Sequence, residues 1–520
     1  MSVDNQRRNV VMIICDELRP DFLNAYGADF IPTPNIDALA ENGVVFENAI
    51  TASTVCSPAR ASILTGRHVS GHDGWTNEIH CKEGVEYFPE RLNAAGYMTA
   101  AVGCLDHPYV KYQYKNQFAV NSGGYREYLL SKYPDAEDGY PMDGYHFKYK
   151  EEDFYDRWNA DRAVDFIESY ATKGEAPDGT KPEKENAPFF LYCGLLSPHS
   201  PHTPPKEVSG TVDINKIPKH INTVNDDVGD VELTRRAYLN TTKQFFHPDE
   251  CEEERMEKRQ AYCELIVEVD ALVGRIVQSL KDNGVYENTT IIFSGDHGSC
   301  DDDHNACTKG PWPYKPQLFV SMIISNDPRL KKGTRCDALC GNMDIGATIL
   351  DIAGDNKPLG MSRSLIGLAN KTIPERETFM SEFCDSSKTI VDKRYTYIIY
   401  PFLGKTRLYD RIADPEERTN LSGNPEYAEL EHKFMLECIE YLILSKGVRI
   451  EAHDMVQKVQ EGIAKKHPNY LDEFDIAFPI ANMTHIERIK AAGLDADFNE
   501  FCRDREIKAH YGVYFFNEKK

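Results

Sequence analysis

The chain has 520 residues, of which 41% are hydrophobic, so it can bury a large core, and we expect one large domain with a smaller one beside it. Its formal net charge of -24 at pH 7 gives the average surface a field that repels polyanions, which argues against nucleic acid as a partner. An anionic substrate must therefore bind in a local positive pocket.

The N-terminal residues and the cysteines indicate where the protein works. Residues 1–8 are polar, and the apolar run at 10–15 is too short for a signal-peptide core or a membrane span. The fourteen cysteines follow no disulfide framework. We therefore expect a cytoplasmic protein without membrane contact, whose thiols are mostly reduced. Cys336 and Cys340 form a small disulfide or a metal clip, or are plain surface cysteines.

The predicted elements alternate between strands and helices over most of the chain. Residues 9–15 (NVVMIIC) are an unbroken apolar run of strand length, as in buried parallel strands. Helical spacing at 35–42 is followed by Gly43, a typical stop. The other predicted elements are strands at 44–49, 99–102, 189–195, 290–294 and 318–324, and helices at 59–64, 88–95 and 254–282.

This alternation predicts an α/β fold with a mostly parallel sheet sandwiched by helices, in a domain that spans residues 1–376. Turn formers and charge at 173–185 and 208–230 predict surface loops.

A change of pattern marks the C-terminal part. Short strands and one helix predict a smaller α/β subdomain at 377–446, with a small antiparallel sheet; its clearest elements are strands at 396–400 and 406–409 and a helix at 425–444. The charged, helical tail at 447–520 ends in an aromatic run at 511–516 that needs covering. We expect the tail to dock on the body or to join copies of the chain into a homo-oligomer.

The sharpest motif is CSPARASILTGR at residues 56–67. Its Cys-x-Pro-x-Arg core is rare, and the extension makes a chance match improbable. Pro58 suits the first turn of a helix, which places Cys56 at the positive N-terminus of that helix. Arg60 lies four residues after Cys56, on the same face, and is expected to point at the same anion.

This motif resembles that of the type I sulfatases of the alkaline phosphatase superfamily, in which a formylglycine-generating enzyme oxidises the cysteine and the hydrated aldehyde attacks sulfur or phosphorus. The resemblance covers about residues 9–444. It implies an alkaline-phosphatase-like fold and a sulfuric ester hydrolase that cleaves small-molecule or saccharide sulfate esters. The plain alternative for Cys56 is a buried structural cysteine before a helix.

Oxygen and imidazole donors follow two predicted strands. Asp16 and Glu17 come directly after the first strand, and Asp296 and His297 follow a late one. Ligands bind at this edge of α/β sheets, and an aldehyde hydrate needs a cation to lose a proton near neutral pH. Together with Cys56 these residues are expected to bind one divalent cation, Ca²⁺ first, with Mn²⁺ or Mg²⁺ as alternatives. Glu17 is a modest departure from the family's acidic pair, and strand-end carboxylates are often only helix caps.

The segment HNACTKG at 304–310 has the His-x4-Lys spacing of the family segment that carries a catalytic lysine. The resemblance assigns Lys309 to the anion and the leaving-group oxygen, and His304 to substrate binding. The alternative for Lys309 is a solvated loop lysine. The preceding acids, Asp301 to Asp303, are expected to be solvated, with a second metal site as the alternative.

Two further segments contribute polar groups. SPHSPH at 197–202 resembles the family's Pro-His-x-Pro segment, so His199 is expected to protonate the departing alkoxide, with His202 as a neighbour. Asn77 either donates a hydrogen bond to the transferred group or is only a turn residue.

The family pattern breaks after the strand predicted at 99–102. Most members have Gly-Lys-x-His there, and this chain has GCLDH at 103–107. Cys104 replaces the lysine, and Asp106 replaces the histidine unless His107 takes that role. Phosphonate monoester and phosphodiester hydrolases of the superfamily also lack the pair, which makes them the alternative activity; a non-catalytic anion-binding relative is the third hypothesis. Asp106 is either the base that breaks down the covalent hemiacetal or a counter-charge for a cationic substrate.

Overall fold

The computed structural model describes residues 7–105, 116–121, 123–136, 141–143, 145–221, 251–306 and 308–446. These residues belong to one compact unit. The expectations for Asp106, for His107 and for the tail at 447–520 fall outside the described residues.

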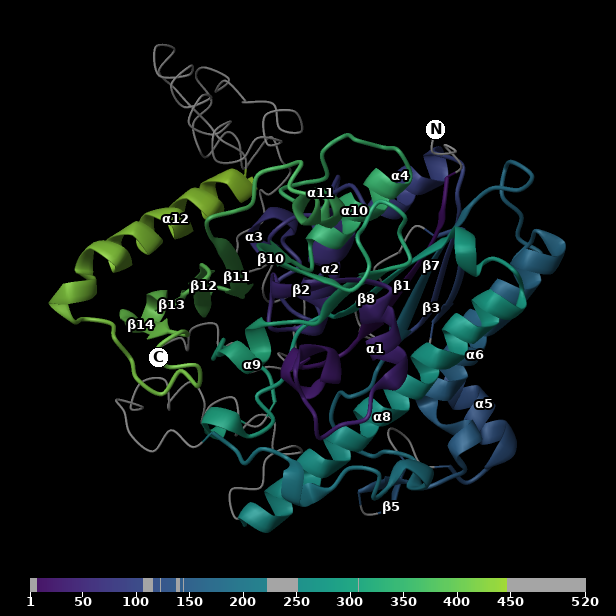
Figure 1. The fold of residues 1–520 in the computed structure, drawn as a ribbon, viewed down its shortest axis with the longest axis horizontal. Coiled ribbons are helices and arrows are strands. Elements are labelled where there is room, and N and C mark those ends of the chain that lie inside the picture. Colours follow the sequence, from purple (N-terminus) through teal and green to yellow (C-terminus); the bar gives the residue numbers. More distant parts are fainter. Residues whose placement is uncertain are drawn as a thin grey trace, which may run out of the picture. The chain divides into compact units, whose positions relative to one another are not determined.

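An eight-stranded sheet forms the centre of the described body (Figure 1). Every neighbouring pair is parallel except the two pairs that β9 makes with β2 and β8. The predicted α/β fold with a mostly parallel sheet is therefore confirmed. In spatial order the strands are β10 (Thr334–Gly341), β2 (Gly43–Ile50), β9 (Met322–Ser325), β8 (Thr289–Gly295), β1 (Asn9–Cys15), β7 (Phe189–Leu195), β3 (Met98–Gly103) and β4 (Phe118–Asn121).

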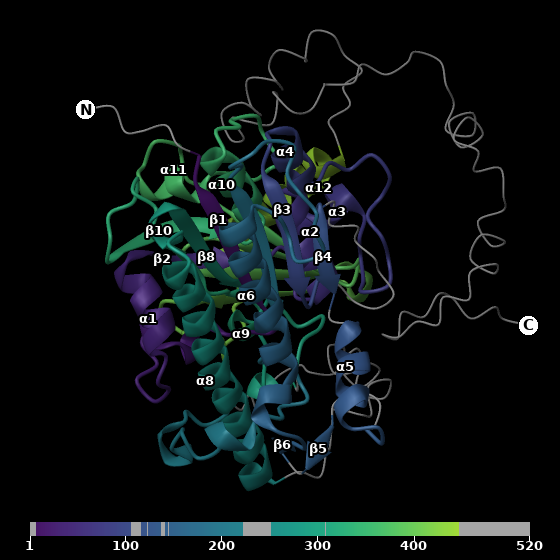
Figure 2. The same cartoon turned by 90° about the vertical axis from the view of Figure 1, so that its right-hand side faces the viewer.

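Both faces of the sheet are buried under helices, which explains why the central strands are apolar throughout. Alternate residues of β1 point to opposite faces, and all seven are buried. One face packs on α1 (Pro34–Glu41), α6 (Tyr155–Lys173) and α8 (Glu252–Asp282), and Figure 2 shows α6 and α8 in front of the strands. The other face packs on α2 (Cys56–Thr65), α4 (Phe88–Ala94), α10 (Asp344–Ile352) and α11 (Leu365–Ala369).

The register of the central strands brings distant residues to one edge. Cys15 of β1 is paired with Gly295 of β8, so the residues that follow both strands emerge side by side. The backbone continues this pairing, because the amide of Asp296 donates to the carbonyl oxygen of Cys15 over 3.0 Å. On the other side of β1, the amide of Asp16 donates to Leu195 of β7 over 3.1 Å.

A second, antiparallel sheet follows the central body. It contains β11 (Phe379–Phe383), β12 (Ser387–Val391), β13 (Tyr395–Tyr400) and β14 (Lys405–Asp410) in chain order, and helix α12 (Ala428–Lys446) packs on it. The small sheet and the helix expected here are present. A domain boundary at residue 376 stays a prediction, because contacts join both sheets in one unit.

Some local expectations need correction. The strand expected at 318–324 begins only at Met322. Leu318 is the last residue of helix α9 (Lys315–Leu318), and residues 319–321 connect this helix to the strand. Cys336 and Cys340 are buried free thiols on β10, so they are neither a disulfide nor surface cysteines. None of the described helices is both long and apolar enough to cross a membrane.

Candidate active site

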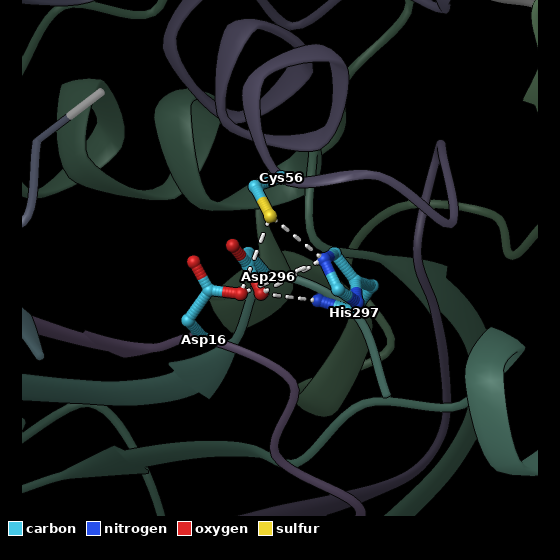
Figure 3. A group of neighbouring side chains, drawn as sticks. All are labelled: Asp16, Cys56, Asp296 and His297. Atoms are coloured by element: carbon cyan, nitrogen blue, oxygen red, sulfur yellow. Dashed lines mark hydrogen bonds and ion pairs between the residues drawn. The ribbon is translucent and has the colours of Figure 1, made fainter. Parts of the chain in front are cut away.

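Four side chains from two strand ends and one helix start meet at the carboxyl edge of the sheet (Figure 3). The Cys56 sulfur lies 3.3 Å from Oδ1 of Asp16 and 3.3 Å from Nε2 of His297. Nε2 of His297 is also 3.8 Å from Oδ1 of Asp296. The ligand atoms of all four residues lie within 4.8 Å of one another, a spacing that suits one divalent cation.

The imidazole of His297 is oriented as a metal ligand requires. Its Nδ1 donates to the carbonyl oxygen of Gly298 over 2.7 Å, which leaves the lone pair of Nε2 facing Cys56 and the carboxylates. A hydrogen bond from the other ring nitrogen is the usual means of fixing the tautomer of a ligating histidine. The donor set of two carboxylates, one imidazole and the side chain at position 56 therefore fits a divalent cation.

Lys309, Glu17 and His199 form a second group beside the first. The ammonium of Lys309 lies 2.7 Å from Oε1 of Glu17 and donates to the Cys56 sulfur over 2.8 Å. Nε2 of His199 lies 3.6 Å from the same Oε1, and its Nδ1 donates to the Ser200 carbonyl oxygen. The site thus has two cationic groups on the side of Cys56 that Glu17 faces.

Arg60 is buried behind the donor group and bonds both of its carboxylates. Its Nε donates to Oδ2 of Asp296 and its Nη2 to Oδ2 of Asp16, each over 2.9 Å. Its Nη1 donates to the carbonyl oxygen of Cys104 over 2.6 Å. The Cys104 sulfur lies 3.4 Å from Nη1, so Cys104 borders the site next to Arg60. In this arrangement the guanidinium orients the carboxylates. Its expected contact with the anion stays a prediction.

Helix α2 presents Cys56 at its N-terminus, and Asn77 satisfies one of its free backbone amides. Oδ1 of Asn77 accepts a hydrogen bond from the amide of Ser57 over 3.0 Å, and the Asn77 side chain is buried. The positive end of the helix dipole therefore lies at Cys56. The side-chain oxygen of Asn77 therefore caps helix α2. Neither of the two roles predicted for this residue includes such a cap.

The charges of the site shift its pKa values in opposite directions. Burial raises the pKa of the Cys56 thiol, so the unmodified sulfur stays protonated at neutral pH. Burial also opposes ionisation of Asp16, but Lys309, His199 and Arg60 outweigh it and lower the pKa of that carboxyl. For His199, burial and Lys309 lower the pKa, while Glu17 and Asp16 prevail and raise it to about 9.

Polar residues that the sequence did not single out hold the site backbone in place. Thr51 and Asn342 each donate to the carbonyl oxygen of Asp296 over 2.7 Å. Thr54 donates to the carbonyl oxygen of Gly310, and Gln317 accepts from the Gly310 amide, so the residue after Lys309 is fixed on both sides.

The loop that carries His199 depends on a buried carboxylate from α6. Asp156 accepts hydrogen bonds from the amides of Leu196 and Ser197, over 2.8 and 2.6 Å. Asp156 is distant in sequence from this loop and carries no motif, so only the fold reveals it. Thr51 and Thr54 come directly before the motif of Cys56, and this position was the one available signal for them.

The small sheet also contacts the segments around α2. The amide of Glu382 donates to the carbonyl oxygen of Ala52, and its carboxylate accepts from the amide and hydroxyl of Ser70. Lys388 pairs with Glu382 over 2.9 Å and lies 4.9 Å from the ring centre of Trp75. The second sheet therefore holds the segments on both sides of α2.

Two histidines singled out from the sequence make aromatic contacts. The ring of His304 stacks on Tyr314 at 3.9 Å, and burial lowers its pKa to about 4. The ring of His202 packs edge-on against Tyr262 at 5.2 Å. The substrate-binding role of His304 stays a prediction.

The expectation of solvated acids at 301–303 is wrong for two of them. Asp301 pairs with Arg259 over 2.8 Å, and Asp303 bonds Arg259 over 2.9 Å and Arg19 over 2.7 Å; all four side chains are buried. Both acids are therefore held in an internal ion-pair cluster, because buried charges require partners.

The mostly parallel sheet with helices on both faces and the donor group at its carboxyl edge define an alkaline-phosphatase-like α/β fold. The sulfatase family model matches residues 8–355, and a model described as N-sulphoglucosamine sulphohydrolase, C-terminal, matches residues 308–442. The chain therefore belongs to the sulfatase family. This membership makes it a sulfuric ester hydrolase and argues against a non-catalytic anion-binding relative.

Similar proteins are known from sequence and from structure. An arylsulfatase of Clostridium perfringens is 28% identical over 471 residues, covering 81% of this chain and 91% of that protein. The phosphonate monoester hydrolase of Agrobacterium radiobacter has a similar fold, with a TM-score of 0.70 and 22% identity over 84% of this chain and 96% of that one. Another similar structure was solved with its substrate D-glucosamine-2-N,6-O-disulfate, with a TM-score of 0.65 and 20% identity over 84% and 97% of the two chains.

Proposed function

We propose that the chain hydrolyses sulfate monoesters of small-molecule or saccharide alcohols with a formylglycine made from Cys56 by a formylglycine-generating enzyme. One divalent cation assists, held by Asp16, Asp296, His297 and residue 56. The observation that carries the proposal is the position of the Cys56 sulfur, which lies at a helix N-terminus, 3.3 Å from Asp16 and 3.3 Å from His297. A structural cysteine would have no need of these polar neighbours.

The unmodified thiol is a poor nucleophile here, because burial raises its pKa and keeps it neutral. The Cys56 sulfur marks the place of an oxygen of the aldehyde hydrate. One hydroxyl of that hydrate would attack the sulfur atom of the sulfate ester. The second hydroxyl would lose its proton when sulfate is later released and the aldehyde is formed again. The proposal thus accounts for a buried cysteine among carboxylates.

The cation would supply positive charge that lowers the pKa of the attacking hydroxyl and binds sulfate oxygen. Ca²⁺ is the first candidate, and the imidazole of His297 favours Mn²⁺ more than an all-oxygen site would.

The residues on the other side of position 56 serve the sulfate and its leaving alcohol. Lys309 is proposed to bind the anion and the leaving-group oxygen, since its ammonium lies 2.8 Å from the Cys56 sulfur. His199 is proposed to donate a proton to the departing alkoxide, because its raised pKa of about 9 keeps it protonated at neutral pH. Arg60 orients Asp16 and Asp296 through its hydrogen bonds to both carboxylates.

The second candidate activity is the hydrolysis of phosphonate monoesters or phosphodiesters by the same residues. Cys104, an uncharged side chain in place of the family's lysine, favours it because the hydrolases of these esters in the superfamily also lack that lysine. The fold likeness to a phosphonate monoester hydrolase agrees with this alternative. Asp106 keeps its two predicted roles, base or counter-charge.

The test combines mass analysis with turnover. The chain is co-expressed with a formylglycine-generating enzyme, and its intact mass is measured beside that of Cys56→Ala. We expect the wild type alone to show conversion of the thiol to the aldehyde, and to hydrolyse an aryl sulfate faster than an aryl phosphonate or phosphodiester. A converted protein that prefers the phosphorus esters would establish the second candidate, and an unconverted but active one would contradict the formylglycine mechanism.

We also propose that the enzyme works in the cytoplasm, in contact with neither membrane nor nucleic acid. The support for this compartment is that the described cysteines are free thiols, as is usual in reducing surroundings.

A further inference from the structure

Glu17 lies beside the proposed cation position but outside its group of donor atoms. Asp16, Cys56, Asp296 and His297 form one compact group, and Glu17 belongs to a second group with Asp16 and His199, whose spacing also suits a cation. Its Oε1 instead lies 2.7 Å from the ammonium of Lys309. A glutamate side chain is one methylene longer than an aspartate, so its carboxylate reaches past the donor group.

The backbone of Glu17 is held in a conformation that turns its side chain this way. Its φ of 62° lies in the left-handed region, which is uncommon for a residue other than glycine. The hydroxyl of Tyr262 donates to the carbonyl oxygen of Glu17 over 2.7 Å and accepts from the amide of Arg19 over 3.0 Å. The Glu17 amide donates to Oδ1 of Asp296 over 3.2 Å. Tyr262 is fully buried on α8, so a rigid element imposes the conformation.

The charges explain what the turned carboxylate does. Lys309 and His199 are both cationic groups that converge on residue 56, and without an anion between them they would repel each other. Glu17 has no exposed surface, and a buried carboxylate of this kind requires charged partners. Oε1 of Glu17 lies 2.7 Å from one cation and 3.6 Å from the other, so both charges lie beside this oxygen, while neither carboxylate oxygen accepts a hydrogen bond from the described residues.

We infer that Glu17 is a positioning residue for the leaving-group side of the site and not a ligand of the cation. Its carboxylate holds Lys309 and His199 facing residue 56, and Tyr262 holds Glu17. The inference rests on the proposed function for the identity of the leaving group. The part of the inference that concerns cation binding can be tested without measuring turnover.

The first test measures cation binding by calorimetry on the full chain after chelation. Mn²⁺ and Ca²⁺ are titrated into the wild type, Glu17→Gln and Asp296→Asn. We expect Glu17→Gln to keep Kd within about threefold of the wild type, and Asp296→Asn to weaken binding by about tenfold or more. A loss in Glu17→Gln that equals the loss in Asp296→Asn overturns the inference, as does a wild type that binds neither ion.

The second test separates positioning from a merely structural role. Sulfate esters of increasingly basic alcohols are compared, because a leaving-group defect grows as the alkoxide becomes more basic. For Glu17→Gln we expect kcat to fall about 100-fold with a poor leaving group and less than about tenfold with nitrophenol. Tyr262→Phe, which removes only the hydroxyl that holds Glu17, should show the same trend with a smaller loss.

The inference is overturned if kcat of Glu17→Gln falls by the same factor for every ester, or does not fall for any of them. Thermal unfolding of each variant shows whether it is folded. If no sulfate ester is hydrolysed but the cations bind, the proposed function fails, and the comparison of Glu17→Gln with Asp296→Asn still decides whether Glu17 is a ligand.

Discussion

Arg60 forms hydrogen bonds with both carboxylates of the donor group. Its three bonds to Asp16, Asp296 and Cys104 use the fork of the guanidinium, which a lysine could not reproduce. A residue that the motif predicts to bind an anion therefore also organises the donors. The sequence motif identifies Arg60, whereas its hydrogen bonds to the buried Asp16 and Asp296 show how it contributes to the site.

Replacing Arg60 by alanine is expected to lower the free energy of unfolding by about 3–5 kcal/mol, because two buried carboxylates lose their counter-charge. Urea unfolding in the presence of chelator measures this loss. The control is Arg335→Ala, which breaks an exposed pair with Glu47 and should change stability by about 1 kcal/mol or less. Added Mn²⁺ should restore part of the loss in Arg60→Ala, and equal losses in both variants would contradict this account.

At the scale of elements, the short helix α3 (Val69–His72) connects helix α2 to the segment that carries Asn77 through hydrogen bonds of His72. Nδ1 of His72 accepts from the amide of Gly74, so its Nε2 carries the proton and donates to Oγ of Ser62 on α2, each over 3.0 Å. This geometry requires a neutral imidazole. Burial first, and then the charges of Arg67 and Lys82, lower the pKa of His72 from 6.5 to about 3.

The depressed pKa of His72 predicts acid sensitivity. Below pH 6.5 the unfolded chain binds a proton at this residue and the folded chain does not, so the stability present above pH 6.5 is lost as pH falls towards 3. At pH 5 this loss amounts to about 2 kcal/mol. Urea unfolding at pH 7.5 and pH 5 measures it, with His72→Gln as the matched variant. The fall in stability between these two pH values should be smaller in the variant, and equal falls would contradict the prediction.

At the scale of the whole molecule, a bound cation should link the strand ends that form the site. Asp16 follows β1, Asp296 and His297 follow β8, and residue 56 begins α2 after β2. A ligand that binds only the folded state stabilises the entire cooperative unit. Cation binding at this edge of the sheet is therefore expected to support the proposed reaction and also to stabilise the folded state.

Chelation is expected to destabilise the protein. A cation at 100 times its Kd adds about 2.7 kcal/mol, so Mn²⁺ or Ca²⁺ should raise the Tm of the chelated protein. Thermal unfolding in chelator and in excess metal measures the shift. Asp296→Asn should show a much smaller shift than the wild type. A wild type whose Tm responds to neither ion would argue against the proposed site.

The tail at 447–520 is proposed to join copies of the chain. Helix α12 ends at Lys446, where the tail begins, and it carries an exposed apolar row at Leu436, Ile439 and Ile443. Light scattering on the full chain should therefore give a mass of more than one subunit, and Ile439→Glu with Ile443→Glu should lower it. A monomeric full chain would contradict the proposal.

The sequence alone predicted the central apolar strands and the helix start at Cys56. Apolar runs such as 9–15 and 189–195 are predicted as strands, because a parallel sheet covered on both faces buries both sides of each strand. The motif around Cys56 likewise needs only local information, since helix start, cysteine and arginine lie within five residues.

Only the tertiary structure showed which side chains of remote elements contact one another. Tyr262 and Glu17 are 245 positions apart, and no sequence period connects the hydroxyl of one to the carbonyl oxygen of the other. The acids at 301 and 303 look solvated in sequence, but arginines from remote segments bury them. Strand order and register bring such residues together, and these depend on packing of the whole chain, so side-chain partners across elements could not be predicted.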